Sequence, residues 1–353
     1  MKPWEQHYVK TIKKEPTAVQ LTVTGEEFVP FTIEFSDAEN KCHRIHRQKD
    51  VSKFYSGKDM LDLAMMAAYY SGIPHFTATV QRKGKELGIV SLTEAKTARE
   101  IESKDENAAE SPLSLLGADL EIMLLNKTTG RFTAVPMQYD FQKEIGVDQA
   151  LIRKNHHFYQ PVIELRARPQ PAGKALHEEF RRLKRIIESK ARAKKLEIIC
   201  EENPVGRFML GGHLHVSSQK PTYRRISLLD SLLTIPLASA QISSSLSRRQ
   251  TYGRLGACRV NKFNGFEYRS LPTWFHLIDN GLPFFQWSET LLFNETLPAF
   301  PVSDETAKAY YTGDRQQLKR AAQESFEKIS SYLTKNEDVR LEDWQHFLKE
   351  LTD

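Results

Sequence analysis

Four short segments of this chain place ionisable side chains at alternate positions of an otherwise apolar run. In a β-strand, residues two positions apart point to the same face of the sheet. Each segment therefore presents two ionisable groups together on one face. The four pairs are Asp119 with Glu121, Glu164 with Arg166, His213 with His215, and Glu267 with Arg269.

Strands with these pairs cannot form a sheet that is packed on an apolar core on both faces, because an unpaired buried charge is very costly. A sheet whose concave face holds divalent metal and a polyanion satisfies the pattern. A single Asp-x-Glu or His-x-His pair usually faces solvent or serves structure. Four pairs in succession on apolar strands instead indicate a functional site.

The carboxylates of this set are typical ligands of a hard cation. Magnesium prefers oxygen ligands and usually shares them with the phosphates of a substrate. We therefore expect Glu121, Glu164 and Glu267 to bind the metal, with His213 adding one imidazole nitrogen. A carboxylate-rich set with one or two histidines favours magnesium or manganese over zinc.

Arginines supply the second half of the predicted chemistry. Arg248, Arg249 and Arg254 follow an apolar, helix-like segment, and Arg269 lies two residues after Glu267. Guanidinium groups bind phosphate through two parallel hydrogen bonds and neutralise a phosphoryl group during its transfer. Neither GxxxxGK[ST] nor GxGxxG occurs in the chain, so the pattern indicates phosphoryl transfer on a scaffold without a phosphate-binding P-loop.

The 353 residues, 40% of them hydrophobic, suffice for two domains. Residues 1–95 are predicted to form a small α+β domain of unknown role, with a hairpin over residues 17–35, a helix over 59–70 and a strand pair over 76–92. Residues 96–114 are charged and poor in large apolar side chains. They are the predicted linker.

Residues 115–300 are predicted to form a catalytic domain, with a helical extension over residues 301–353 packed on it. The expected elements are a helix over 173–195, strands over 196–200 and 211–217, a buried helix over 224–246, an apolar helical stretch over 274–293 and a polar helical tail over 306–351.

Bulk properties exclude several classes of protein. The net charge of +5 is too small to argue for nucleic-acid binding by itself. No stretch approaches the roughly 20 apolar residues that span a bilayer, and the first residues lack the pattern of a signal peptide. Cys42, Cys200 and Cys258 are widely spaced and form no CxxC pair, which is typical of reduced thiols. These features predict a cytoplasmic protein. They leave the number of subunits undecided.

Together the segments GADLE, VIELRARPQP, GGHLHV, SRRQTYGRLG and FNGFEYRSLPTWF resemble the carboxylate–amine ligases. The chain is most similar to the phage-type COOH-NH2 ligase type 2, or amidoligase, group, which is related to glutamine synthetase and glutamate–cysteine ligase. The resemblance covers residues 115–290. It implies an α+β fold whose curved, mainly antiparallel sheet faces ATP and two or three metal ions, with helices at its flanks.

The resemblance also implies roles for individual residues. Glu121, Glu164 and Glu267 fall on metal-binding positions, as does His213. Arg269 falls on the position that acts on the phosphoryl group or the substrate carboxylate. The phosphates of ATP would be contacted by one of the other arginines: Arg248, Arg249 or Arg254.

Two departures from glutamine synthetase stand out. Asp119 replaces a glutamate, so its shorter side chain is expected to reach a metal through water. Residues 168–172 supply no acid where glutamine synthetase has a further metal-binding glutamate. A second or third metal ion is therefore expected to bind weakly or to be absent.

The implied reaction is ATP-dependent formation of an amide or peptide bond. A carboxylate of an amino acid or peptide takes the γ-phosphoryl group of ATP, and an amine then displaces phosphate from the acyl phosphate. The amine must lose a proton, so a base is needed near the acyl carbon. His215 and Asp119 are the candidates.

Three other functions fit the same residues. A guanidino kinase on this fold would yield a phosphoguanidine in place of an amide. A metal-dependent hydrolase of an amide or phosphoester would turn over without ATP. A non-catalytic binding protein would recruit partners through its N-terminal domain, although the complete set of ionisable pairs argues against catalytic silence.

Overall fold

The computed structural model describes most of the chain. The described residues are 10–46, 48–54, 56–95, 114–132, 144–148, 150, 152–154, 157–204, 206, 208–240, 246–261 and 263–352. The predicted linker, residues 96–114, lies outside these ranges except for its last residue.

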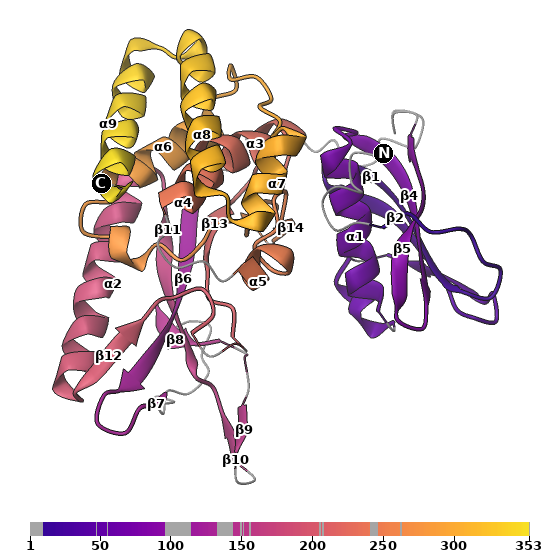
Figure 1. Ribbon diagram of the computed structural model, residues 1–353, viewed down its shortest axis with the longest axis horizontal. Coiled ribbons are helices and arrows are strands. Elements are labelled where there is room, and N and C mark those ends of the chain that lie inside the picture. The colour runs from indigo at the N-terminus through magenta and orange to yellow at the C-terminus, as the bar shows by residue number, and fades with distance from the viewer. Residues whose placement is uncertain are drawn as a thin grey trace.

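The N-terminal unit is a five-stranded antiparallel sheet with one helix on it (Figure 1). Alternation of apolar and polar residues forms the strands, and the apolar stripe of α1 closes the core over them. The predicted hairpin, helix and strand pair are all confirmed. The strands, in the order β3-β2-β1-β4-β5, are β1 (Val19–Glu26), β2 (Val29–Ser36), β3 (Cys42–Ile45), β4 (His75–Lys83) and β5 (Glu86–Glu94); η2 (Gln48–Lys53) precedes α1 (Gly57–Tyr70).

A larger open sheet follows, in which every strand pair is antiparallel. Its main path runs β14-β15-β13-β6-β11-β8, and β7 and β12 pair with the outer part of β6. Its strands are β6 (Leu116–Asn126), β7 (Arg131–Phe132), β8 (Ile145–Val147), β11 (Val162–Gln170), β12 (Leu196–Ile199), β13 (Gly212–Val216), β14 (Cys258–Val260) and β15 (Phe266–Tyr268). A separate hairpin joins β9 (Ile152–Lys154) to β10 (His157–Tyr159).

Helices cover the apolar face of this sheet (Figure 1). The residues of β6 alternate strictly: Leu116, Ala118, Leu120 and Ile122 are buried in the main core, and the residues between them face the other way. The helices are α2 (Gly173–Ala193), α3 (Tyr223–Leu229), η4 (Asp230–Thr234), α4 (Ile235–Ala240), α5 (Leu246–Gln250), η5 (Phe275–Leu277), α6 (Leu282–Phe293), α7 (Asp304–Thr312), α8 (Arg315–Ile329), η6 (Ser330–Tyr332) and α9 (Lys335–Thr352). The predicted α+β class with an antiparallel sheet is confirmed.

The buried helix expected over residues 224–246 is interrupted by a π-helical turn, η4. Pro236 has no N–H with which to bond the carbonyl of Leu232 four residues earlier. That carbonyl instead accepts hydrogen bonds from the indole nitrogens of Trp287, at 3.0 Å, and Trp344, at 3.2 Å. The sequence analysis missed this turn, because its backbone is satisfied by side chains distant in the chain.

The apolar stretch over residues 274–293 is likewise two elements rather than one. A 3₁₀ turn, η5, ends at Leu277, and α6 begins only at Leu282. The chain passes so close to itself that a Cβ on Gly281 would lie 2.4 Å from the carbonyl oxygen of Leu277. Pro283 then occupies the first turn of α6, where a missing N–H does no harm.

None of the helices in the described ranges is both long enough and apolar enough to cross a lipid bilayer.

Candidate active site

The register of four adjacent strands brings the predicted residues together. Asp119 on β6 pairs with Arg166 on β11 and with His213 on β13. Glu121 pairs with Glu164. On the other side of β13, His215 pairs with Glu267. All lie on the face of the sheet opposite the helices, as the period of two predicts.

Asp119 lies at the centre of this face. Its Oδ2 lies 2.8 Å from Nε2 of His215, and its Oδ1 lies 2.7 Å from Nδ1 of His213. Burial alone would raise the pKa of Asp119, but the two imidazoles together hold it well below its usual value. Although burial opposes it, the same pairing raises the pKa of His215.

Glu267 is the most buried carboxylate of the site, with 3% of its side chain exposed. Its Oε1 lies 3.1 Å from Nε of Arg269 and 3.7 Å from Nδ1 of His213, and its Oε2 pairs with Nε of Arg259. Burial would raise the pKa of Glu267, but interactions with His213, Arg269 and Arg259 lower it. Glu267 is therefore an anion held by positive charge on several sides.

In contrast to Glu267, Glu164 and Glu121 both have raised pKa values. Burial, reinforced by the charge of Asp119, raises the pKa of Glu164 to about 9, although Arg166 contacts its Oε2. Burial also raises the pKa of Glu121, whose Oε2 accepts a hydrogen bond from the backbone N–H of Gly211 at 2.9 Å. Three crowded carboxylates thus carry a repulsion that a cation would relieve.

The chemical types of these residues suit a divalent cation. Their side chains, however, are not arranged around a common point where such a cation would bind. Carboxylate oxygens dominate the set, which suits magnesium or manganese. Asp119 Oδ1 is buried and makes no geometrically acceptable hydrogen bond within the described residues. However, no three His, Cys, Asp or Glu side chains in the described part of the chain are arranged to hold a metal ion. Arg166 and Arg259 each occupy one oxygen of a predicted metal ligand, Oε2 of Glu164 and Oε2 of Glu267.

Close packing requires both glycines at the start of β13: Gly212, its first residue, and Gly211, which precedes it. A Cβ on Gly211 would lie 2.0 Å from Nη2 of Arg248, and one on Gly212 would lie 1.9 Å from Nε1 of Trp274. Arg248 is thereby fully buried beside Gly211, and its Nη2 donates to the carbonyl of Arg269 at 3.1 Å. Within the described residues its Nε and Nη1 find no hydrogen-bond partner.

The other two predicted phosphate ligands lie apart from each other. Arg249 is buried, donates to the carbonyl of Tyr310 at 2.7 Å and lies over its ring. Arg254 is partly exposed and extends toward α1, where its Nη1 lies 3.0 Å from the sulfur of Met66. In this conformation Arg254 is the more accessible of the three, and the prediction that one of them contacts ATP stays a prediction.

Residues 116–349 match the family model of the phage phiEco32-like COOH.NH2 ligase-type 2 proteins. The chain belongs to this family. The match extends beyond residue 290, where the resemblance in the sequence ended, so the C-terminal helices α7, α8 and α9 are part of this ligase's family region. No curated protein matches the chain significantly.

Several solved structures are similar to this ligase-family chain at low identity. One is a novel glutamine synthase homolog, 16% identical, covering 67% of this chain and 70% of that one, with a TM-score of 0.31. Ligand-free GmaS is 12% identical, covering 98% and 94%, with a TM-score of 0.37. Plasmodium falciparum glutamine synthetase is 9% identical, covering 97% and 96%, with a TM-score of 0.37. Such low scores add nothing to the family assignment.

Two residues of the site region escaped the sequence analysis. Arg259 pairs with Glu267 from the neighbouring strand β14. Asp230 is fully buried beneath Tyr268, on the far side of β15 from Glu267. Asp230 did carry a sequence signal, since it is the one acid within the apolar run at residues 226–240. A buried acid in an apolar helix needs partners that the sequence alone does not reveal.

Proposed function

We propose that this protein is an ATP-dependent carboxylate–amine ligase that forms an amide through an acyl phosphate. The observation that carries the proposal is the strand register. It aligns Glu121 with Glu164, His213 with Asp119 and His215 with Glu267, on one face of a sheet in a ligase-family chain. The substrates that we propose are an amino acid or peptide carboxylate and a separate amine.

The first step transfers the γ-phosphoryl group of ATP to the carboxylate. A carboxylate oxygen attacks the γ-phosphorus, the bond to the β,γ-bridging oxygen breaks, and ADP leaves with the electron pair. Arg269, which is 21% exposed and held against Glu267, is positioned to neutralise charge on the transferring group. A magnesium or manganese ion bound by Glu121, Glu164, His213 and Glu267 would neutralise further phosphate charge.

The second step forms the amide. The amine nitrogen attacks the acyl carbon, the bond from that carbon to the phosphate oxygen breaks, and inorganic phosphate leaves. The nitrogen loses a proton, for which His215 is the best-placed acceptor, because its side chain is 31% exposed and its Nε2 is held by Asp119. That hydrogen bond orients the imidazole and strengthens it as a base.

Trapping the acyl phosphate tests this function directly. The protein is incubated with ATP, magnesium, hydroxylamine and a panel of amino acids and peptides, and hydroxamate is measured. A ligase yields hydroxamate that depends on ATP and on one class of carboxylate. Phosphoguanidine formed from a guanidino compound would show a kinase, and amide or phosphoester cleavage without ATP would show a hydrolase. Either product without hydroxamate would refute the proposal.

A further inference from the structure

The N-terminal unit is joined to the larger unit by buried hydrogen bonds rather than by surface contact alone. Tyr69, near the end of α1, donates from its hydroxyl to Oδ2 of Asp230 at 2.5 Å. Tyr69 is 5% exposed and belongs to the main core, as does Phe28 from the turn between β1 and β2. The rings of Phe28 and Tyr69 lie 5.8 Å apart, so both side chains enter the core together.

Asp230 also holds the strand that carries two site residues. Its Oδ1 accepts from the hydroxyl of Tyr268 at 2.5 Å, and that hydroxyl lies 2.6 Å from Oγ1 of Thr234. Tyr268 stands between Glu267 and Arg269 in sequence, on the opposite face of β15. Fixing Tyr268 from below therefore fixes the direction in which Glu267 and Arg269 project above.

A third bond extends this control to the loop before β14. The backbone N–H of Gly256 donates to Oδ2 of Asp230 at 2.6 Å. Gly256 has a positive φ of 76°, and a Cβ there would lie 2.7 Å from Cγ of Tyr69. The loop is therefore packed directly against the ring of Tyr69. Arg254, the most accessible of the predicted phosphate ligands, lies in the same loop.

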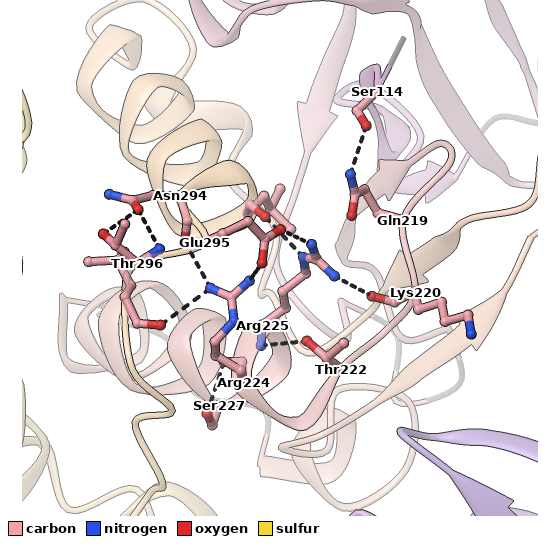
Figure 2. Close-up of polar contacts among 12 residues, drawn as sticks. Ser114, Gln219, Lys220, Thr222, Arg224, Arg225, Ser227, Asn294, Glu295 and Thr296 are labelled. Atoms are coloured by element: carbon pink, nitrogen blue, oxygen red, sulfur yellow. Dashed lines mark hydrogen bonds and ion pairs between the residues drawn. The ribbon is translucent and has the colours of Figure 1, made fainter. Parts of the chain in front are cut away.

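β15 needs this support because its own pairing is short. It has three residues, and its outer neighbour β14 is a three-residue edge strand. The helical segment that carries Asp230 is in contrast firmly anchored. At its start Arg224 and Arg225 both pair with Glu295, and Thr222 caps the helix (Figure 2). Glu27 of the N-terminal unit accepts from the N–H of Tyr223 at 2.5 Å.

We infer that Asp230 is a positioning residue through which Tyr69 of the N-terminal unit holds β15, and with it Glu267 and Arg269, in their working orientation. The N-terminal unit is thus a structural part of the catalytic site rather than an independent module. The role of Glu267 and Arg269 in catalysis rests on the proposed function, whereas the effect on β15 itself does not.

The test replaces one hydroxyl at a time. Tyr69→Phe removes the bond to Asp230, and Tyr332→Phe is the control, because the Tyr332 side chain is exposed on η6 and makes the same change of residue type. Two quantities are measured in the full chain: hydrogen exchange of the segment 256–270, and kcat and KM for ATP turnover. Tyr69→Phe loses a hydrogen bond to a charged group. We therefore expect hydrogen exchange of this segment to become roughly tenfold faster and kcat to fall roughly tenfold.

The control is expected to stay within about twofold of the wild type in both quantities. In Tyr69→Phe we expect kcat to fall more than KM for ATP changes, because the substrate sites persist while their geometry loosens. If Tyr69→Phe exchanges and turns over like Tyr332→Phe, the inference is overturned. If the wild type turns over nothing, the proposed function fails, and hydrogen exchange alone still decides the inference.

Tyr268→Phe provides a second variant that leaves the N-terminal unit seated. Because Tyr69 and Tyr268 act through one carboxylate, the double variant is expected to lose little more than the worse single variant, within about twofold. This holds for exchange and for kcat. Losses that multiply independently would contradict a shared path through Asp230.

Discussion

At the scale of single residues, the account depends on charges that are held in place before any ligand arrives. Glu267 is buried, and cations surround it, so its negative charge is required for the order around it. Arg269 contributes a planar fork that one ammonium group cannot reproduce. Both side chains can therefore be tested by substitutions that keep size and change charge or shape.

Glu267→Gln should lower kcat at least about a hundredfold while the fold persists, since the amide keeps the volume but loses the negative charge. Circular dichroism and thermal unfolding check the fold, and phosphate release checks activity. Glu34→Gln is the matched control, because Glu34 lies 3.8 Å from Arg44 on the surface of the N-terminal unit. Full activity of Glu267→Gln would remove Glu267 from the site.

Arg269→Lys should reduce kcat/KM almost as severely, by about a hundredfold, because a point charge cannot bind an equatorial pair of phosphate oxygens. Steady-state kinetics with ATP as the varied substrate measures this effect. Arg320→Lys, on the exposed surface of α8, is expected to keep wild-type kinetics. A lysine that supports normal turnover at position 269 would show that only charge is needed there.

At the scale of elements, the π-helical turn η4 shows what the sequence could and could not predict. The period of two correctly paired residues on β6, β11, β13 and β15, because strand geometry alone decides which side chains share a face. The same reasoning could not find the π-helical turn η4 that precedes Pro236, or the partners of Asp230. Both depend on Trp287, Trp344, Tyr69 and Tyr268, which fold in from distant parts of the chain.

The carboxyl group in η4 should make stability depend on pH. Burial, only partly offset by hydrogen bonds from Tyr268, Tyr69 and Gly256, raises the pKa of Asp230 from 3.8 to about 6. Its protonated form is thus favoured in the folded state, and this stabilisation is complete below about pH 4 and lost as the pH rises through about 6.

The shift corresponds to about 3 kcal/mol. Compared with Asp230→Asn, which does not titrate, the free energy of unfolding of the wild type should fall by up to that amount between pH 4 and pH 7. Urea denaturation of both proteins at several pH values measures the difference. A difference that is constant, or that rises with pH, would contradict the raised pKa.

At the scale of the whole molecule, two hydrophobic cores meet where Tyr69 and Phe28 enter the larger one. Composition and periodicity predict a separate N-terminal unit, and the five strands of that part of the chain form a sheet distinct from the larger one. The attachment of the two units could not be predicted, because tyrosine hydroxyls in a helix carry no sequence signal of a distant acceptor. The family match likewise includes the C-terminal helices, which bury Trp344 and Phe347 against the core.

The central claim is that this sheet joins a carboxylate to an amine at the expense of ATP. The most direct test incubates the purified protein with ATP and magnesium against paired carboxylates and amines, and measures phosphate release and product mass. The account predicts phosphate release that requires both partners, with a product lighter than their sum by one water. ATP turnover that needs no amine, or a product that carries the phosphate, would contradict it.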